Sequence, residues 1–320
     1  MKATKVIPQR PKIKDVAKLA GVSPALVSLA LNGKPYVSKQ AKEKIYRAIK
    51  KLGYRPNIVA RSLRQKRTGT IGLVLSDIAN PFFPEIARGV EQRAREYEFN
   101  VILCNTDADP FQEEKSIETL LSKQVDGLII SSARSIDNLK RYLKESRPIV
   151  LVNRDPAPGM FDFVGIDNVS SAKVAVNHLI KLGHERIAFI EGEPASAASF
   201  GRYEGYKMAL KEARLSLKEN YVRIGYLKYE GGYRAMLFFL RQTSPPTAVF
   251  CANDMMALGA IDACMDKNVR APQDMAIVGF DDMWVASLKT VQLTTMRQPR
   301  SQIGEKAVDL MMERIEGKRD

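Results

Sequence analysis

The sequence predicts an α/β protein that begins with a small, all-helical unit. From Thr70 onward, short apolar runs alternate with amphipathic stretches, a pattern typical of parallel sheets covered by helices on both faces. Residues 1–70 follow a helical period instead, and they hold 18 Lys and Arg against only Asp15 and Glu43. The whole chain carries +14, so the remaining 250 residues, with 32 basic and 34 acidic side chains, are nearly neutral. This division predicts a basic module for a polyanion, joined to a neutral α/β body.

Size and composition restrict the class of protein. At 320 residues and 45% hydrophobic side chains, the chain has material for two or three domains. No stretch approaches the roughly 18 apolar residues of a membrane helix, and the basic N-terminus lacks the apolar run of a signal peptide. We therefore expect a cytoplasmic protein. The few cysteines and histidines are scattered, which indicates neither a disulfide framework nor a metal site; they are Cys104, Cys251, Cys264, His178 and His184.

Residues 13–20 predict the first of two short helices, with Val16, Leu19 and Ala20 on one apolar face. Gly21 suits a left-handed residue in a tight turn. Ser23 and Pro24 then form an N-cap and a first-turn proline, a strong start for a second helix.

The second helix has a buried stripe of Val27, Ala30 and Leu31. Ala25 and Leu29 point away from this stripe, and Leu26 and Ser28 flank them. Two helices joined at this spacing form a helix-turn-helix, whose second helix enters the major groove of DNA.

A third helix is expected over residues 39–52, capped by Ser38 and ended by Gly53. Its apolar face contains Ile45, Ala48, Ile49 and Leu52. Four lysines lie off that face, where they either contact phosphates or are only solvated: Lys42, Lys44, Lys50 and Lys51.

Residues 57–65 predict a short helix that is marginal on its own. Asn57 is a suitable N-cap, and Leu63 lies between Arg61 and Arg64 with no core nearby. An apolar side chain flanked by arginines fits a wedge inserted into the minor groove. The alternative is a plain basic linker.

The neutral body predicts two parallel sheets. Strands are expected at 70–76, 100–105, 126–132, 148–153, 186–192, 247–253 and 275–280, and helices at 82–98, 111–124, 170–182, 201–214, 231–241, 254–267 and 300–316. The chain is expected to change sheets near Val164–Asn168 and again near Leu293–Pro299.

Ligands of open α/β sheets bind beyond the carboxyl ends of the strands, and polar or aromatic residues follow the predicted strands here. They are Asp77, Asn80, Phe82, Phe83, Asn153, Arg154, Asp167, Asn168, Asn253, Asp254, Asp281 and Asp282, with Arg202 opening a helix. Such a set suits a small hydroxylated ligand. For Asp254 and Asp282 a helix cap is the favoured role, and for Trp284 packing. Because the chain lacks G-x-G-x-x-G, a P-loop and G-x-S-x-G, neither a nucleotide cofactor nor catalysis is expected.

The motif IKDVAKLAGVSPALVSLALN, followed by VS, LGYRPN and ARSL, resembles the lactose/galactose repressor family of bacterial transcription regulators, from about residue 12 to the end. The resemblance implies a non-enzymatic homodimer whose helix-turn-helix heads read half-sites of a near-palindromic operator. It implies a hinge helix that places Leu63 between base pairs, with Ala60 and Arg64 beside it. The implied DNA-binding set is Ile13, Val16, Ser23, Pro24, Ala25, Leu26, Ser28, Leu29, Asn32, Asn57, Ala60, Leu63 and Arg64.

The resemblance also implies the domain borders. These are an arm at 1–11, a DNA-binding domain at 12–56, a hinge at 57–69 and a body at 70–320. The body resembles the periplasmic-binding-protein fold, with one subdomain at about 70–167 plus 297–320 and another at about 168–296.

An effector cleft between the subdomains is part of this resemblance. The implied effector contacts are Phe82, Phe83, Arg202, Asn253 and Asp281, together with Asn153 and Asp167. A purine-responsive relative would carry an arginine near Ser196, so a sugar or related polyol is the preferred effector.

Two departures from the family pattern stand out. The groove-facing residues Pro24, Ala25 and Leu29 are apolar where the family often has polar or basic ones. We therefore expect readout through thymine methyl groups, Ser28, Asn32 and bending at the hinge. The family also usually continues past the last helix into a strand and an L-I-x-R-x-S-like segment, so either the chain is truncated after Asp320 or it does without them.

The expected mechanism is a population shift, in which the effector favours one arrangement of the subdomains. That arrangement then decides whether the hinge helix is ordered or frayed. Two other classes stay open at this level: a sugar-binding receptor without a DNA role and a sugar-processing enzyme. The sequence leaves the effector, the direction of its effect and the operator undefined.

Overall fold

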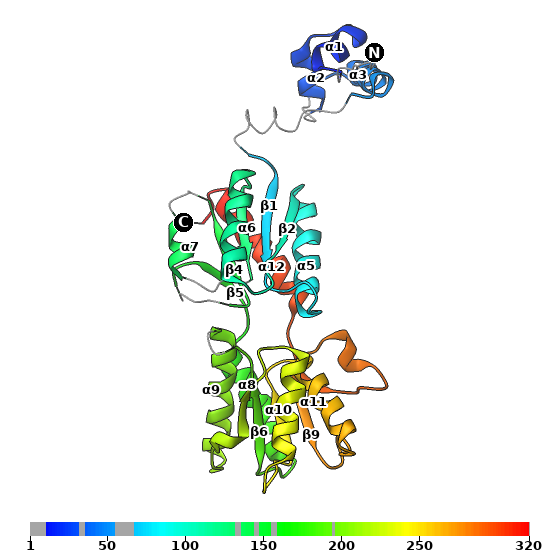
Figure 1. Cartoon of the computed structure of the whole chain (residues 1–320). Coiled ribbons are helices and arrows are strands. Elements are labelled where there is room, and N and C mark those ends of the chain that lie inside the picture. Colours follow the sequence, from blue (N-terminus) through cyan, green and yellow to red (C-terminus); the bar gives the residue numbers. More distant parts are fainter. Residues whose placement is uncertain are drawn as a thin grey trace, which may run out of the picture. The chain divides into compact units, whose positions relative to one another are not determined.

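A computed structural model describes residues 11–31, 36–54, 67–131, 136–143, 147–154, 159–193 and 196–319, with side chains omitted at 136–138 and 143. The chain divides into two compact units, residues 1–68 and 69–320, called here the head and the body (Figure 1). The predicted α/β class with an N-terminal helical unit is confirmed. Within the described ranges, none of the helices combines the length and apolar character that a bilayer crossing requires.

The head contains three helices, α1 (Ile13–Ala20), α2 (Pro24–Leu31) and α3 (Lys39–Leu52). The predicted start and stop residues are confirmed. Gly21 has φ 67° and Gly53 has φ 58°, the left-handed values that favour glycine. The Oγ of Ser23 accepts from the Leu26 amide at 3.1 Å, and the Oγ of Ser38 accepts from the Ala41 amide at 3.3 Å.

The core of the head is centred on Val16, Val27 and Ile45, all fully buried. The predicted burial of Leu19 is wrong, because its side chain is 45% exposed and Ala17 is buried instead. Since α1 packs against both α2 and α3, its buried face turns toward position 17 rather than position 19.

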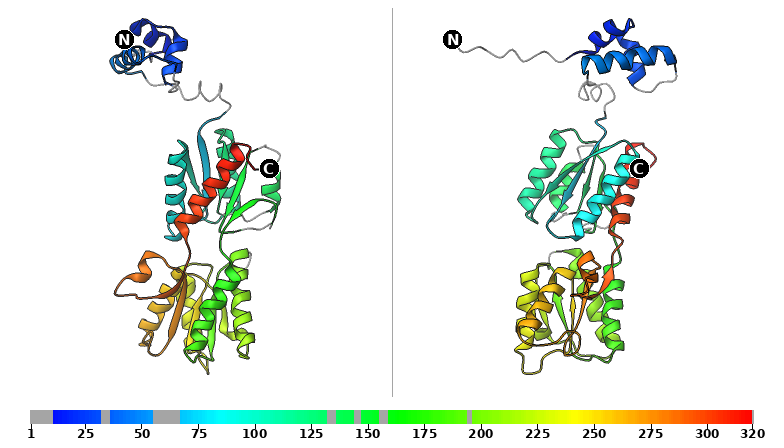
Figure 2. Two further views of the ribbon diagram at one scale, coloured as in Figure 1. Left: turned by 180° about the vertical axis from the view of Figure 1, so that it is seen from behind. Right: turned by 90° about the vertical axis from the view of Figure 1, so that its right-hand side faces the viewer.

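The first sheet of the body has the strand order β2-β1-β3-β4-β5, all parallel. Its strands are β1 (Thr70–Leu75), β2 (Asn100–Asn105), β3 (Gly127–Ile130), β4 (Ile149–Val152) and β5 (Asp162–Val164). One face is covered by α5 (Phe82–Glu96) and α12 (Arg300–Ile315), which lie side by side (Figure 2). The other face is covered by α6 (Pro110–Ser122) and α7 (Ile136–Leu143). The C-terminal helix therefore belongs to the first sheet.

The second sheet has the strand order β10-β9-β8-β6-β7, also parallel. Its strands are β6 (Ile187–Glu191), β7 (Val222–Ile224), β8 (Ala248–Cys251), β9 (Ala276–Asp281) and β10 (Thr294–Arg297). The helices α8 (Asn168–Lys181) and α9 (Ala197–Glu212) pack together, as do α10 (Tyr229–Leu240) and α11 (Asp254–Asp266). The chain crosses between the sheets after β5 and after β10, where the sequence predicts the changes.

All seven predicted strands and seven predicted helices of the body are present. The sequence reading missed α7, β5, β7 and β10, which are short and lack a long apolar period. The predicted position of Arg202 at the start of a helix is wrong. The helix α9 begins at Ala197, earlier than predicted, so Arg202 lies in its second turn.

Candidate functional site

The head presents one exposed face of α2. Pro24, Ala25 and Leu29 are exposed, and Leu26 and Ser28 are half-buried beside them. The only hydrogen-bonding side chain among these five residues is that of Ser28. This face therefore exposes mainly methyl and methylene groups, which can pack on a thymine methyl but cannot hydrogen-bond to base edges.

The other predicted DNA-contacting residues divide into three groups. Ile13 is half-buried at the start of α1, and the Ser23 hydroxyl caps α2. Val16 is withdrawn from the set, because its side chain is fully buried in the core of the head. The remaining positions lie outside the described residues: Asn32, Asn57, Ala60, Leu63 and Arg64.

In the body, side chains from both sheets line one small cavity beyond the carboxyl ends of the strands. Its volume is about 30 Å³, enough for one or two water molecules. The first sheet contributes Asn80, Phe82, Phe83, Asn153 and Arg154. The second sheet contributes Ser196, Ala198, Ser199, Arg202, Leu227, Asn253 and Asp281. We call this cavity and its lining the cleft.

Several contacts hold the Arg202 side chain in the cleft. Its Nε donates to Oδ1 of Asn168 at 2.9 Å, its Nη1 donates to the carbonyl oxygen of Ala252, and its guanidinium lies 3.9 Å from the ring centroid of Phe280. The Nη1 is 3.8 Å from Oδ1 of Asp281. Both charges are buried, so each depends on the other to offset its lost hydration.

Two buried carboxyl groups lie beside Arg202. Asp281 accepts from Nε2 of Gln298 at 2.7 Å, and Asp254 accepts from the Met283 amide at 2.8 Å and from the Thr295 hydroxyl at 2.6 Å. Burial raises the pKa of Asp281 to about 7, although the Arg202 charge favours its ionised form. Burial likewise raises the pKa of Asp254 to about 6, against the Thr295 and Met283 hydrogen bonds. Burial lowers the pKa of Arg202, because desolvation disfavours every charge here.

The backbone of the cleft is strained at three lining residues. Asn153, Leu227 and Asp281 have φ values of 65°, 60° and 121°, a region that residues with a Cβ rarely adopt. Such strain collects at ligand sites, where the fold must hold a side chain in one place. The side chain of Asn253 is also fixed, since it caps α11 through the Met256 amide and donates to the Leu227 carbonyl oxygen.

The cleft brings together six of the seven effector contacts implied by the sequence, all except Asp167. Asp167 is exposed and caps α8, where its carboxylate accepts from the amide and hydroxyl of Ser170 at 2.9 and 2.6 Å. Its side chain therefore satisfies a backbone donor at the N-terminus of α8. Trp284 also lies outside the cleft and is exposed.

Six lining residues were not in the predicted site: Asn80, Arg154, Ser196, Ala198, Ser199 and Leu227. Asn80 and Arg154 follow predicted strands, so their positions were visible in the sequence. The others lie in loops and in the first turn of α9, and no periodicity points to them. The Ser196 hydroxyl is buried and has no hydrogen-bond partner among the described residues.

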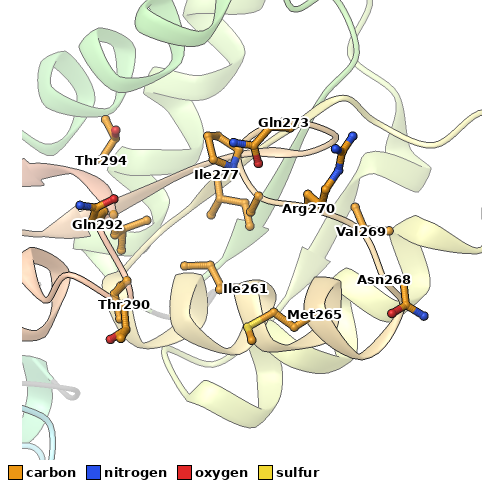
Figure 3. A pocket seen from close by; sticks show the side chains of 14 residues that line it. Ile261, Met265, Asn268, Val269, Arg270, Gln273, Ile277, Thr290, Gln292 and Thr294 are labelled. Carbon is orange, nitrogen blue, oxygen red and sulfur yellow. The ribbon is translucent and has the colours of Figure 1, made fainter.

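A larger cavity, of about 600 Å³, lies in the second subdomain and shares no residue with the cleft. It lies between α11, β9 and the chain around Thr290–Thr294, with Ile261, Met265 and Ile277 on its walls (Figure 3). Its one charged side chain, Arg270, is paired with Asp274 through two contacts of 2.7 Å. Its other polar side chains are uncharged: Asn268, Gln273, Thr290, Gln292 and Thr294. It therefore lacks the buried charged groups of the cleft.

Two family models match the chain. Residues 12–57 match "Bacterial regulatory proteins, lacI family", and residues 68–320 match "Periplasmic binding proteins and sugar binding domain of LacI family". The chain belongs to the lacI family. The family's members are transcriptional regulators.

Several relatives of this lacI-family protein match over nearly the whole chain. It is 39% identical to the HTH-type transcriptional regulator RegA of Clostridium saccharobutylicum (96% of this chain, 93% of RegA). It is 38% identical to the ribose operon repressor of Escherichia coli K12 (95% and 92%) and to the repressor PurR of Haemophilus influenzae PittEE (95% and 90%).

Solved structures agree with this lacI-family assignment. The Lac repressor dimer bound to operator and the anti-inducer ONPF matches with TM-score 0.89 at 26% identity, over 97% of this chain and 94% of that one. A complex of the transcriptional regulator CelR with cellobiose matches with TM-score 0.74 at 33% identity, over 97% and 95%.

The buried carboxyl groups predict that this lacI-family body loses stability as pH rises. The folded pKa values of Asp281 and Asp254 lie above the usual value of 3.8, so the folded chain holds protons that the unfolded chain has released. The contribution of these two protonated groups to the free energy of unfolding is complete below about pH 4. It declines as pH rises through about 6 and 7. We expect a loss on the order of 1–3 kcal/mol between pH 5 and pH 8, measured by urea unfolding.

Asp281→Asn should reduce this dependence on pH. The matched control is Asp274→Asn, since Asp274 is exposed and hydrogen bonds from Arg270 lower its pKa to about 2. A slope between pH 5 and pH 8 that is the same in Asp281→Asn and in the unsubstituted protein would contradict the assignment.

Proposed function

We propose that the chain is a sequence-specific DNA-binding transcriptional repressor controlled by a small-molecule effector in the cleft. The observation that carries the proposal is the pairing of two parts in one chain. The head exposes the groove-facing side of a helix-turn-helix, and the body closes a polar, strained cleft at the ends of two parallel sheets. The family supplies the link between them, in which effector binding changes affinity for an operator.

The functional form is a homodimer that acts in the cytoplasm on a near-palindromic operator. The Lac repressor structure is a dimer bound to operator, and two-fold symmetry of the protein matches the symmetry of such a site. Phosphate contacts of the basic residues in the head supply affinity that falls as salt rises.

In-vitro selection of binding sites from random duplex DNA tests the head. We expect a near-palindrome with thymine favoured where Leu29 meets the groove, because its side chain can only make apolar contacts. Leu29→Ala should weaken this preference and lower affinity by roughly 5–30-fold, the cost of about 1–2 kcal/mol of lost contact. Exposed Tyr46 on α3 provides a control, as Tyr46→Ala should leave the selected sequence unchanged.

If the selection enriches no particular sequence, the regulator proposal is contradicted. A strong guanine preference opposite Leu29, with that residue in contact, would contradict apolar readout but leave the regulator intact.

The proposed effector is a sugar or related polyol. The cleft combines the aromatic wall of Phe82 and Phe83 with hydroxyl, amide and guanidinium groups, a set suited to hydroxylated rings. A ribose operon repressor and a cellobiose-bound regulator are among the similar proteins. By the family resemblance, a purine-responsive relative would carry an arginine near Ser196, where this chain has the uncharged run PASAASFG. The cavity of about 30 Å³ is far smaller than a monosaccharide, so binding requires the subdomains to separate first.

A thermal-shift screen of pentoses, hexoses, cellobiose and purine bases tests the effector class. Saturating sugar should raise the melting temperature of the body by several degrees, since binding to the folded state alone stabilises it. Ser196→Ala should reduce the shift, because it removes a buried hydroxyl that has no hydrogen-bond partner among the described residues. Ser216 is exposed, and Ser216→Ala should leave the shift unchanged.

A purine base as the sole ligand would overturn the sugar assignment. Equal shifts in the unsubstituted protein and in the Ser196→Ala and Asn80→Ala variants would place the ligand elsewhere. Turnover of a bound sugar would favour the enzyme alternative, for which we find no nucleophile–base pair among the lining residues.

A further inference from the structure

Two oppositely charged side chains, one from each subdomain, meet beside the cleft. Arg154 follows β4 of the first sheet, and Glu193 follows β6 of the second. The Nη1 of Arg154 lies 3.4 Å from Oε2 of Glu193, with the two side chains 7% and 20% exposed. The pair therefore joins the two subdomains directly, in surroundings where water screens the attraction only partly.

The backbone holds Arg154 in place. The Arg154 amide donates to the Val152 carbonyl oxygen at 2.7 Å, which closes a three-residue turn with Asn153 at φ 65°. This turn geometry is rare and strained for a residue with a Cβ. The Asn153 amide also donates to the Val164 carbonyl oxygen at 3.0 Å, which ties the turn to β5. The fold thus maintains an unfavourable backbone that directs Arg154 toward the second subdomain.

Glu193 is held on the opposite side. Its amide donates to Oγ of Ser199 at 3.0 Å, which fixes the loop after β6 to the first turn of α9. A Cβ at the preceding Gly192 would lie 2.3 Å from the same Oγ, so the loop lies close against α9. Both partners of the pair therefore start from anchored main chain, which lowers the entropic cost of their contact.

We propose that Arg154 and Glu193 form a latch that holds the two subdomains closed over the cleft. Arg154 also faces the buried charge of Arg202, and Glu193 offsets this repulsion. Loss of the Glu193 charge removes a cross-subdomain attraction and leaves two like charges, Arg154 and Arg202, in one cavity. Both effects favour the open arrangement.

The latch also defines what an effector must supply. The closed cleft has no room for a sugar, so the pair must separate before a ligand enters. An effector that then presents oxygen acceptors to Arg154 takes the place of Glu193. This last step rests on the proposed function, whereas the latch itself is a property of the body and can be tested without an effector.

The test is a distance measurement between the subdomains in the full chain. Spin labels are attached at Phe111→Cys on α6 and Glu230→Cys on α10, both exposed positions near the carboxyl ends of the strands. Cys104 is replaced by serine, and Cys251 and Cys264 are fully buried. Pulsed electron spin resonance of the ligand-free protein then measures closed and open populations.

Glu193→Gln should raise the ratio of open to closed molecules by about fivefold or more, the lower end of typical coupling between sites. Arg154→Gln should raise this ratio less, because the substitution also removes the repulsion between Arg154 and Arg202. The double variant should resemble Arg154→Gln, because the contact with Glu193 and the repulsion from Arg202 are both already lost once Arg154 is replaced. The matched control is Lys173→Gln, which breaks the 2.7 Å pair with Glu212 inside the second subdomain. It should leave the distances unchanged.

Unchanged distances in Glu193→Gln, whose partly exposed side chain makes misfolding a minor concern, would overturn the latch. So would an equal change in Lys173→Gln. Operator binding measured on the same samples keeps the two proposals separate. Absence of operator binding by the unsubstituted protein would contradict the regulator function, and normal operator binding with unchanged distances in Glu193→Gln would contradict only the latch.

Discussion

Val16→Asn is expected to unfold the head and to lower operator affinity more than 100-fold, while the body keeps its own thermal transition. Val16 is fully buried between the three helices of the head. An asparagine amide placed there without hydrogen-bond partners costs about 3 kcal/mol or more, once the lost apolar contacts are included. So small a domain has only a few kcal/mol of stability. Fluorescence anisotropy with operator DNA and calorimetry of the full chain measure the two effects.

Leu19→Asn is the matched control, in the same helix and with the same replacement residue. Because Leu19 is 45% exposed, this variant should fold and bind operator with nearly unchanged affinity. Helical periodicity alone predicts burial at both positions and therefore equal damage. Equal damage in the two variants would contradict the packing of α1, and intact binding by Val16→Asn would mean that the head is not held by this core.

Gly89→Ala is expected to lower the melting temperature of the body by about 5–10 °C. A Cβ at Gly89 in α5 would lie 2.1 Å from the Ser301 carbonyl oxygen in α12, so the two helices would have to move apart. Such overpacking typically costs 1–3 kcal/mol and occasionally more, and each kcal/mol corresponds to about 2–4 °C in a body of this size. The melting temperature from calorimetry is the measurement.

Helix propensity predicts the opposite sign for this substitution, since alanine stabilises a helix interior by roughly 0.5–1 kcal/mol relative to glycine. Gln92→Ala, at an exposed position of the same helix, should change stability by no more than about 0.5 kcal/mol. An increase in melting temperature for Gly89→Ala would mean that α5 and α12 are not in backbone contact.

The helix α12, which packs on α5, is also connected to the cleft. The C-terminal helix follows directly after the second crossing between the sheets, and Arg300 at its start donates to the Asp281 carbonyl oxygen of the second subdomain. Asp281 in turn is part of the cleft. A change in the cleft therefore has a short covalent and hydrogen-bonded route to the helix that packs on the first sheet.

The sequence by itself determined the features that depend on neighbours along the chain. Helix caps at Ser23 and Ser38, the left-handed Gly21 and Gly53, and the alternation of strands and helices all follow from interactions within a few residues. Local chemistry of this kind is sufficient to identify the helix-turn-helix and two parallel sheets. It also predicted a ligand site at the carboxyl ends of the strands, where the cleft lies, because that rule depends on topology alone.

Tertiary structure alone decided which of those residues line the cleft. The cleft collects side chains that follow β1, β4, β6, β7, β8 and β9, and only their meeting in space gives Arg154 a partner in Glu193 and leaves the Ser196 hydroxyl uncommitted. Asp167 lies in the crossing between β5 and α8, but its carboxylate caps α8. Burial and charge around Asp281 come from distant segments, so its raised pKa has no counterpart in the local sequence. Contacts between distant residues form only when the chain is packed, and they separate a side chain that lines the cleft from one that caps a helix.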